Sequence, residues 1–189
     1  MKREVRISTD LIPTPVVLVT TQMPGKSPNI ITLAWVGVVN SDPPMVGIGV
    51  RPERHSTPAL RETGEFCVNI PHEGIIRAVD VCGVVSGKTT DKFALTGLTP
   101  EKASKVMPPL IRECPINLEC RVVRSLELGS HTWFIGEILT VHWDEAILDE
   151  KGKIDLSKFK PIAYCPGIHN YHALGEKLGK YGFTKGKMS

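Results

Sequence analysis

Six strand-like segments with very little helix between them set the strongest limit on how this chain can fold. They cover residues 15–21, 30–39, 45–50, 65–70, 116–128 and 132–143. Parallel strands need crossover connections of a dozen or more residues, usually helices. The only helical patterns here are short, at 58–63, 74–81 and 91–95. The sequence therefore predicts a mainly β protein, an antiparallel barrel with a few short flanking helices, rather than a doubly wound parallel sheet.

The ends of these segments carry turn signals. Asp42-Pro-Pro44 is expected to end the second strand, since proline cannot donate to a β-ladder, and Gly129-Ser130 predicts a tight hairpin between the two longest strands. The chain beyond Phe159 contains Pro161, Pro166 and Gly167 and is predicted to be irregular. We expect one domain over 1–189, with 159–189 as an irregular C-terminal extension.

The stretch that follows the third strand has the pattern of an anion site. Thr57 is a good N-cap, Pro58 suits the first helical position and Gly64 suits the helix end. The first turn of such a helix has unpaired backbone N–H groups and the positive end of the helix dipole. Side-chain donors surround it: Arg51, Arg54, His55, Ser56 and Thr57. The pattern predicts a phosphate-binding site.

Composition narrows the class of protein. The net charge is only +3, from 23 basic and 20 acidic residues, which does not favour nucleic acid as a partner. Residues 1–10 lack the apolar core of a signal peptide, and no apolar run reaches the roughly 20 residues that span a bilayer. We expect no membrane association and a cytoplasmic location. The five cysteines have no C-x-x-C spacing, so neither a disulfide framework nor a zinc site is expected.

Three local motifs allow more than one interpretation. Residues 83–90 resemble a P-loop, but the glycine spacing is one residue short and the preceding segment is helical, so we reject a nucleotide triphosphatase. Lys88 in this loop either contacts a ligand or lies in an exposed turn. His169-Asn-Tyr-His172 lacks further metal ligands, and we predict no metal. His131 is either a proton donor at the barrel rim or an exposed turn residue.

Taken in order, several motifs resemble the flavin reductase-like, FMN-binding split-barrel family, which includes flavoredoxins. The matching elements are Pro13-Thr-Pro-Val-Val-Leu-Val-Thr, Asn29-Ile-Ile-Thr-Leu-Ala-Trp35, Ser41-Asp-Pro-Pro, Ser56-Thr57, Gly64-Glu-Phe-Cys-Val-Asn69, Ser86-Gly-Lys with Asp91-Lys-Phe93, and Gly129-Ser-His-Thr-Trp-Phe-Ile-Gly-Glu137. The resemblance extends from about Pro13 to Trp143. It implies a six-stranded Greek-key split barrel, FMN as cofactor, and a homodimer with the flavin near the subunit interface.

The resemblance also implies roles for individual residues. Thr32 and the backbone of Leu33, Ala34 and Trp35 fall where relatives contact the flavin ring and its tail, and Asn29 is a further cofactor-binding candidate. The phosphate end falls at Arg51, Ser56 and Thr57, bordered by Lys88 and Lys92. His131 matches a histidine on the electron-donor side and is the catalytic candidate, while Tyr164 and His169 are secondary candidates. Many relatives have Asp at the position of Ser130, and this difference weakens the case for a nicotinamide donor.

Three functions remain open on the sequence alone. The first is an FMN-dependent oxidoreductase that takes electrons from NAD(P)H and passes them to free flavin, ferric iron or a protein. The second is a flavoredoxin-like carrier that holds FMN tightly and exchanges electrons with a reduced electron-transfer protein. The third is a non-redox module that binds another phosphate-bearing ligand.

Overall fold

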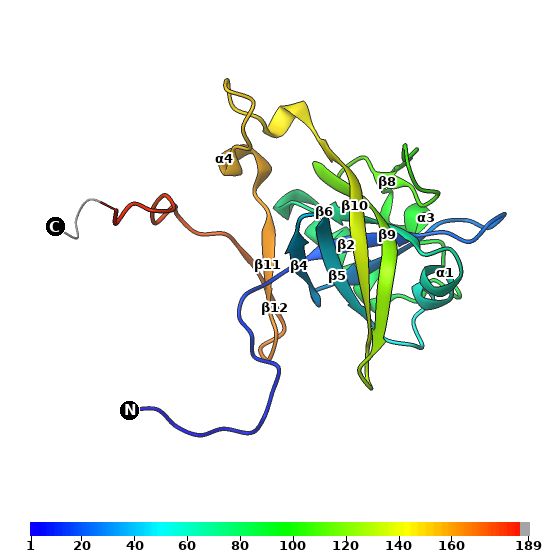
Figure 1. The fold of residues 1–189 in the computed structure, drawn as a ribbon, viewed down its shortest axis with the longest axis horizontal. Helices are drawn as coiled ribbons and strands as arrows, with labels where there is room; N and C mark the ends of the chain where they lie inside the picture. The colour runs from blue at the N-terminus through cyan, green and yellow to red at the C-terminus, as the bar shows by residue number, and fades with distance from the viewer. Residues whose placement is uncertain (186–189) are drawn as a thin grey trace.

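The computed structural model describes residues 1–185 as a barrel-like body from which both chain ends extend on the same side (Figure 1). Within these residues the main sheet has seven strands, each antiparallel to its neighbours. They are β2 (Val17–Thr21), β3 (Asn29–Leu33), β4 (Val36–Ser41), β5 (Pro44–Val50), β6 (Glu65–Ile70), β9 (Ile116–Glu127) and β10 (Thr132–Trp143). The predicted mainly β, antiparallel split-barrel class is confirmed.

The order of the strands is β3-β2-β6-β9-β10-β5-β4. Among the strands of this sheet, β6, β9 and β10 are successive in the chain and adjacent in space, and the earlier strand β5 lies against β10. This is Greek-key order. The predicted hairpin joins β9 to β10 at Gly129, whose φ of 87° is in the left-handed region, and the N–H of Leu128 donates to the carbonyl of His131 at 2.9 Å.

The two faces of the central strands are covered by different cores. Alternation along β2 sends Val17 and Val19 to the barrel interior, where they pack with Ile48, Phe66 and Phe134. Val16, Leu18 and Ile30 point the other way and pack with Val79, Cys82 and Phe93. Both faces are therefore dry, which explains why β2 is buried along its whole length.

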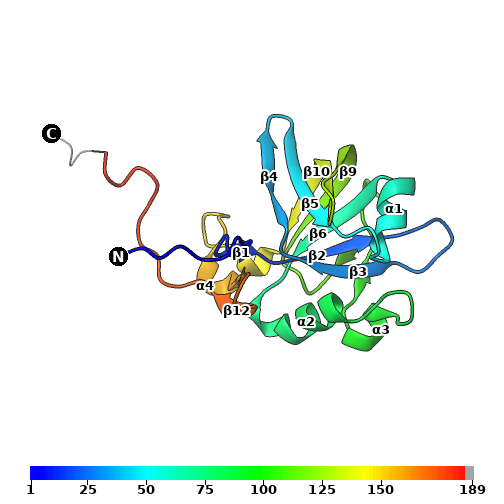
Figure 2. The ribbon, with the colours of Figure 1, turned by 90° about the horizontal axis from the view of Figure 1, so that it is seen from below.

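The helices are short, as predicted. α1 (Ser56–Glu62) connects β5 to β6, while α2 (Ile76–Val84) and α3 (Lys92–Thr96) lie along the β2–β3 side of the sheet (Figure 2). The remaining elements are η1 (Glu73–Ile75), η2 (Glu145–Ile147), α4 (Leu156–Phe159) and the small pair β7 (Pro100–Glu101) and β8 (Leu110–Ile111). No helix of the described residues is long and apolar enough to cross a membrane.

The segment after Phe159 is more regular than predicted. β11 (Ile162–Cys165) and β12 (Asn170–Ala173) form an antiparallel sheet with β1 (Thr14–Pro15), in the order β1-β11-β12. Pro166-Gly167, which we interpreted as a break, forms the turn of this hairpin. The prediction of an irregular extension is wrong over these strands, and residues 186–189 of it lie outside the described range. The limits of the predicted single domain stay a prediction.

The predicted strand 30–39 is two strands. β3 ends at Leu33 and β4 begins at Val36, with a bend at Ala34-Trp35 between them. The bend contains neither glycine nor proline, and it is held by the N–H of Gly49, which donates to the carbonyl of Trp35 at 2.8 Å. This division gives seven strands where six were expected.

The predicted cap of α1 is also wrong. His55 occupies the N-cap position in a helical conformation without a side-chain cap bond, and Thr57 lies inside the helix. The Thr57 hydroxyl donates to the carbonyl of Arg51 at 2.9 Å, and its N–H donates to the carbonyl of Arg54 at 3.0 Å. Since the Thr57 N–H is already paired, side-chain donors must supply more of any anion site here than the sequence suggested.

Candidate functional site

Trp35, at the bend between β3 and β4, lies against His131 at the β9–β10 hairpin. The two rings are nearly parallel, with centroids 5.6 Å apart and an interplanar angle of 9°. The indole is 39% exposed. A stacked pair with one partly open face suits contact with a further planar ligand.

His131 is set in a positively charged environment. Ser130 Oγ lies 2.9 Å from its Nδ1, so the serine orients the ring. Burial lowers the pKa of His131, Arg51 lowers it further, Glu53 opposes the shift and Arg54 adds to it. The imidazole is therefore held in its neutral form more strongly than a free histidine.

A cavity of about 520 Å³, the central pocket, opens beside this stack. Its lining includes six of the predicted site residues: Thr32, Leu33, Ala34, Trp35, Arg51 and His131. Asn29, Ser56, Thr57, Lys88 and Lys92 do not line it. The predicted ring-contact residues and the catalytic candidate thus share one cavity.

The other predicted residues gather around His55. Asn29 Nδ2 donates to Ser56 Oγ at 2.8 Å. Gly87 lies so close to Asn29 and His55 that a Cβ there would meet Asn29 Oδ1 and come within 2.9 Å of His55 Cδ2. The glycine brings the turn that carries Lys88 against the start of α1.

Positive charge accumulates at this cluster. Burial lowers the pKa of His55, and the charges of Lys88, Lys92 and Lys26 lower it further. With Arg51 and Arg54 acting on His131, basic groups extend from His55 to the rim of the central pocket. A continuous positive field beside an open cavity attracts an anionic ligand.

Two predicted cofactor residues use their donors inside the fold. Lys92 is 5% exposed, and its Nζ donates to the carbonyls of Ile30 and Cys82 at 2.8 Å each. The Thr32 hydroxyl donates to the carbonyl of Val79 at 2.5 Å. The Thr32 bond ties β3 directly to α2, and the two Lys92 bonds tie α3 to both. Thr32 lines the central pocket, so the lone pairs of its Oγ1 stay available to a ligand, whereas Lys92 is buried outside the lining.

The secondary candidates Tyr164 and His169 lie in the central pocket, and the structure adds Tyr171 from the same C-terminal hairpin and Asp80 from α2. Arg54 lines the pocket with them. Tyr171 Oη donates to Asp80 Oδ1 at 3.3 Å. Burial, followed by the charge of Asp80 and this hydrogen bond, raises the pKa of Tyr171 to about 12. Tyr171 and Asp80 were missed because no local pattern marks them: they are 91 positions apart and meet only through tertiary packing.

The pair His169 and His172 has no metal-site geometry in the described chain. No group of three or more His, Cys, Asp or Glu side chains within residues 1–185 is arranged to hold a metal ion. His169 Nδ1 lies instead 2.9 Å from Tyr164 Oη.

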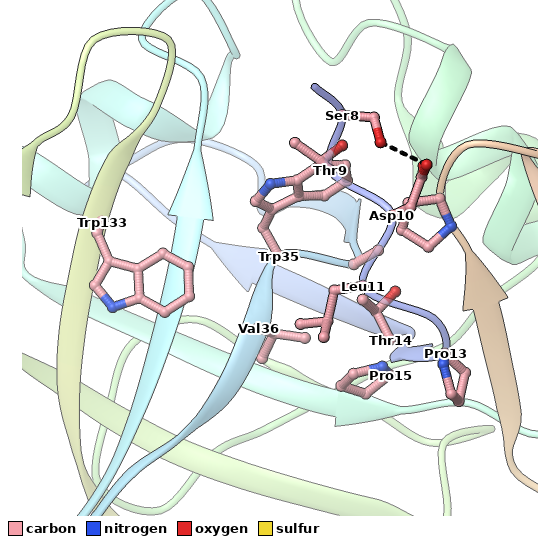
Figure 3. A pocket seen from close by; sticks show the side chains of 12 residues that line it. Ser8, Thr9, Asp10, Leu11, Pro13, Thr14, Pro15, Trp35, Val36 and Trp133 are labelled. Atoms are coloured by element: carbon pink, nitrogen blue, oxygen red, sulfur yellow. Dashed lines mark hydrogen bonds between the residues drawn. The ribbon is translucent and has the colours of Figure 1, made fainter. Parts of the chain in front are cut away.

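A second cavity, of about 610 Å³, lies on the other side of Trp35 and is called here the N-terminal cavity. Figure 3 shows Trp133 and Val36 on one side of it and the Ser8–Leu11 segment on the other. Gly47 and Gly49 of β5 leave the space that the Trp133 indole fills, since a Cβ on Gly47 would lie 2.5 Å from Trp133 Nε1. The room beside these two glycines is therefore taken by tryptophan.

Comparisons with known proteins agree with this geometry. The family model described as flavin reductase like domain matches residues 9–172. The structure of flavoredoxin from Desulfovibrio vulgaris (Miyazaki F) superposes with a TM-score of 0.92 and 35% identity, covering 98% of this chain and all of that one. Flavoredoxin from Methanosarcina acetivorans gives a TM-score of 0.89 with 33% identity over the full length of both chains.

A curated relative extends the likeness in sequence. An uncharacterized protein of Archaeoglobus fulgidus is 37% identical over 130 residues, which is 69% of this chain and 73% of that protein. The family model covers most of the chain, including the strands that build the central pocket and the C-terminal hairpin that closes it. This chain therefore belongs to the flavin reductase-like domain family.

Proposed function

We propose that this protein is an FMN-dependent oxidoreductase of the flavin reductase type. It passes electrons from a reduced donor, NAD(P)H, through FMN to free flavin, ferric iron or a protein acceptor. The observation that carries the proposal is the central pocket, which joins the Trp35–His131 stack to a cluster of basic residues. When bound, FMN supplies the redox chemistry, and the protein supplies anchoring and orientation.

The residues present fit the phosphate end of FMN. A phosphate is a dianion near neutral pH, and the positive charges of Arg51 and Arg54 beside His131 and of Lys88 beside His55 suit it. Asn29 and Ser56 add neutral donors, linked at 2.8 Å. The non-redox alternative would use the same anion site but leaves the aromatic stack and the family membership without a role.

The residues also fit the flavin ring. Leu33 and Ala34 supply backbone and apolar surface, and Trp35 supplies a flat side chain beside His131. Backbone N–H groups at this bend are suited to hydrogen bonds with ring heteroatoms. In the proposal, neutral His131 donates a hydrogen bond at the side where the electron donor approaches.

A flavoredoxin-like carrier is the second candidate, and two observations favour it. The flavoredoxin of Desulfovibrio vulgaris shares 35% identity across nearly the whole chain. Ser130, at a position where the family resemblance implies aspartate, gives His131 a neutral partner at 2.9 Å. In this version FMN stays bound, and a reduced electron-transfer protein replaces NAD(P)H as donor.

The proposal includes a homodimer in the cytoplasm, with neither nucleic acid nor membrane as partner. The edge strand β4 carries exposed Val38 and Val39, and the extended N-terminal segment carries exposed Ile7 and Leu11. Exposed apolar side chains on an edge strand favour association with another protein surface. The five cysteines are buried free thiols, which suits a reducing compartment.

The test is titration of the apo protein with FMN, followed by anaerobic reduction. We expect a perturbed oxidised-flavin spectrum on binding and bleaching of that spectrum by stoichiometric NADH or NADPH. Bleaching by reduced ferredoxin but by neither NADH nor NADPH supports the flavoredoxin-like carrier instead. An unchanged FMN spectrum in the presence of excess protein overturns both.

A further inference from the structure

The hydrogen bond between Tyr164 and His169 is built at a conformational cost. His169 has a φ of 55°, in the left-handed region that residues other than glycine rarely adopt. Gly167 in the same turn has a φ of 83°. The strained backbone turns the imidazole back toward β11, where its Nδ1 meets Tyr164 Oη at 2.9 Å. Backbone strain retained at a ligand pocket is typical of a functional position.

The rest of the fold holds the two side chains in register. Tyr164 is paired with Thr14 on one side and with Tyr171 on the other, and the Thr14 hydroxyl donates to its carbonyl at 3.2 Å. Asp10 of the N-terminal segment packs directly on Gly167. The turn that carries His169 is therefore held in place by Asp10, which lines the N-terminal cavity, as well as by the two strands of the hairpin.

The pair connects the central pocket to solvent. Tyr164 is half-buried and lines the pocket with Trp35 and His131, whereas His169 also lines it but is exposed. A phenol inside the cavity, bonded to an imidazole that water can reach, has the arrangement of a short proton-transfer chain.

We propose that Tyr164 and His169 deliver a proton to the acceptor that is reduced in the central pocket. The inference rests on the proposed function, because the electrons come from the reduced flavin of that function. Tyr164 Oη–H transfers its proton to an oxygen or nitrogen atom of the acceptor, breaking the phenol O–H bond as the new bond forms. As the phenolate takes the proton on Nδ1 of His169, the exposed Nε2 takes a proton from solvent, so the ring stays neutral throughout. Exchange with water then restores the Nδ1–H tautomer.

This direction of transfer fixes the resting arrangement. His169 Nδ1–H donates to Tyr164 Oη, which leaves the phenol hydrogen free to point into the pocket. The acceptor class is a two-electron acceptor that gains protons, such as a quinone, rather than a one-electron metal complex. The other charged or titratable groups that face the pair are Asp10, Arg51, Arg54, Asp80, His131 and Tyr171.

The first experiment compares two acceptors with the FMN-loaded protein after reduction by dithionite. Benzoquinone takes up protons on reduction, and ferricyanide does not. We expect Tyr164→Phe and His169→Gln to slow reoxidation by benzoquinone by about 100-fold, the low end of general-acid contributions. Ferricyanide rates stay within about twofold in the same variants, since no proton is transferred. The control Tyr181→Phe removes a phenol that is 97% exposed in the C-terminal segment and leaves both rates unchanged.

Equal slowing with both acceptors, or none with benzoquinone, overturns the proton-transfer role. If both variants reoxidise with benzoquinone at the wild-type rate, another group, such as His131, donates the proton to the acceptor. If the proposed function itself is wrong, the result is distinguishable from these outcomes: the wild-type protein binds no FMN, or its reduced flavin is not reoxidised by ferricyanide.

A second readout needs neither cofactor nor turnover. The ¹⁵N shifts of the His169 ring in the apo protein report which nitrogen carries the proton. We expect an Nδ1–H tautomer in the wild type and its loss in Tyr164→Phe. A wild-type ring with its proton on Nε2 and an unprotonated Nδ1 overturns the relay, even if FMN binds and turns over normally.

Discussion

His142 Nε2 lies 2.7 Å from Oε1 of Glu119, a carboxylate with no surface exposed to solvent. The same carboxylate accepts bonds from the backbone N–H groups of Ser104, Lys105 and Val106 and from the Ser104 hydroxyl. It therefore ties the loop after β7 to the centre of β9. A buried charge with this many donors is stable only while all of them are present.

We predict that Glu119→Gln destabilises the fold by about 3 kcal/mol, because an amide cannot accept all of these bonds and presents its own donors to N–H groups. Urea unfolding at neutral pH measures the change. Glu127→Gln is the control: it removes an ion pair with Arg61 whose side chains are 52% and 80% exposed, and exposed pairs contribute under about 1 kcal/mol. Equal losses in the two variants would show that the buried network is unimportant.

The same carboxylate predicts acid sensitivity. Burial alone would raise the pKa of Glu119, but hydrogen bonds from the Ser104 backbone, His142, the Lys105 backbone and the Ser104 hydroxyl lower it to about 2, against 4.5 for a free glutamate. A carboxyl with a lowered folded-state pKa stabilises above its unfolded pKa, and that stabilisation is lost as pH falls. We expect wild-type stability to fall between about pH 4.5 and 2 by about 3 kcal/mol more than that of Glu119→Gln. Parallel pH profiles would contradict the assignment.

The two lysines of the predicted cofactor site are expected to behave differently. Lys92→Met leaves the carbonyls of Ile30 and Cys82 without their donor and costs about 2 kcal/mol of stability. Lys88→Met, in an exposed turn, leaves stability unchanged and weakens FMN binding by about 1 kcal/mol, or roughly fivefold. Riboflavin lacks the phosphate, so its affinity should not respond to Lys88→Met. Denaturant unfolding and fluorescence titration with both flavins separate these effects.

Trp35→Leu tests the ring end of the pocket. Loss of an aromatic stacking partner costs about 1 kcal/mol beyond apolar contact, so FMN affinity should fall about fivefold. Riboflavin affinity should fall by the same factor, unlike the response to Lys88→Met. Trp143→Leu is the matched control, since that indole is 50% exposed at the far end of β10. If Trp35→Leu leaves the FMN affinity unchanged, the Trp35–His131 stack does not contact the flavin.

Most strands of the main sheet could be predicted from the sequence, but the features that shape the central pocket could not. Apolar segments bounded by turn residues marked the strands, because burial of a strand leaves a local pattern in the sequence. The bend at Ala34-Trp35 depends on a hydrogen bond from Gly49, and the Tyr171–Asp80 bond joins distant segments. Such tertiary contacts leave no periodic signal. The candidate residues at 29–35 and 131 followed from family resemblance, whereas the relay at His169 required the observed turn.

The cross-strand pair Gly37 and Gly47 offers the sharpest test of how β5 is packed. The two residues face each other across β4 and β5. A Cβ on Gly47 would lie 2.5 Å from Trp133 Nε1 and 2.6 Å from Cε2 and Cζ2, whereas nothing lies within 4 Å of a Cβ on Gly37. We expect Gly47→Ala to destabilise the fold by about 1–3 kcal/mol through overpacking and to shift the emission of Trp133, which must move toward the N-terminal cavity. Gly37→Ala should change stability by under about 0.5 kcal/mol, as surface substitutions usually do.

A double variant distinguishes steric conflict from loss of glycine flexibility. If the Trp133 ring is the cause, replacing it with leucine removes the clash, and Gly47→Ala costs less in the Trp133→Leu background than in the wild type. Neighbouring residues with a shared contact typically couple by about 0.5–3 kcal/mol. Additive effects would mean that the ring is not what excludes a side chain at position 47. The alanine would then act through the β5 backbone.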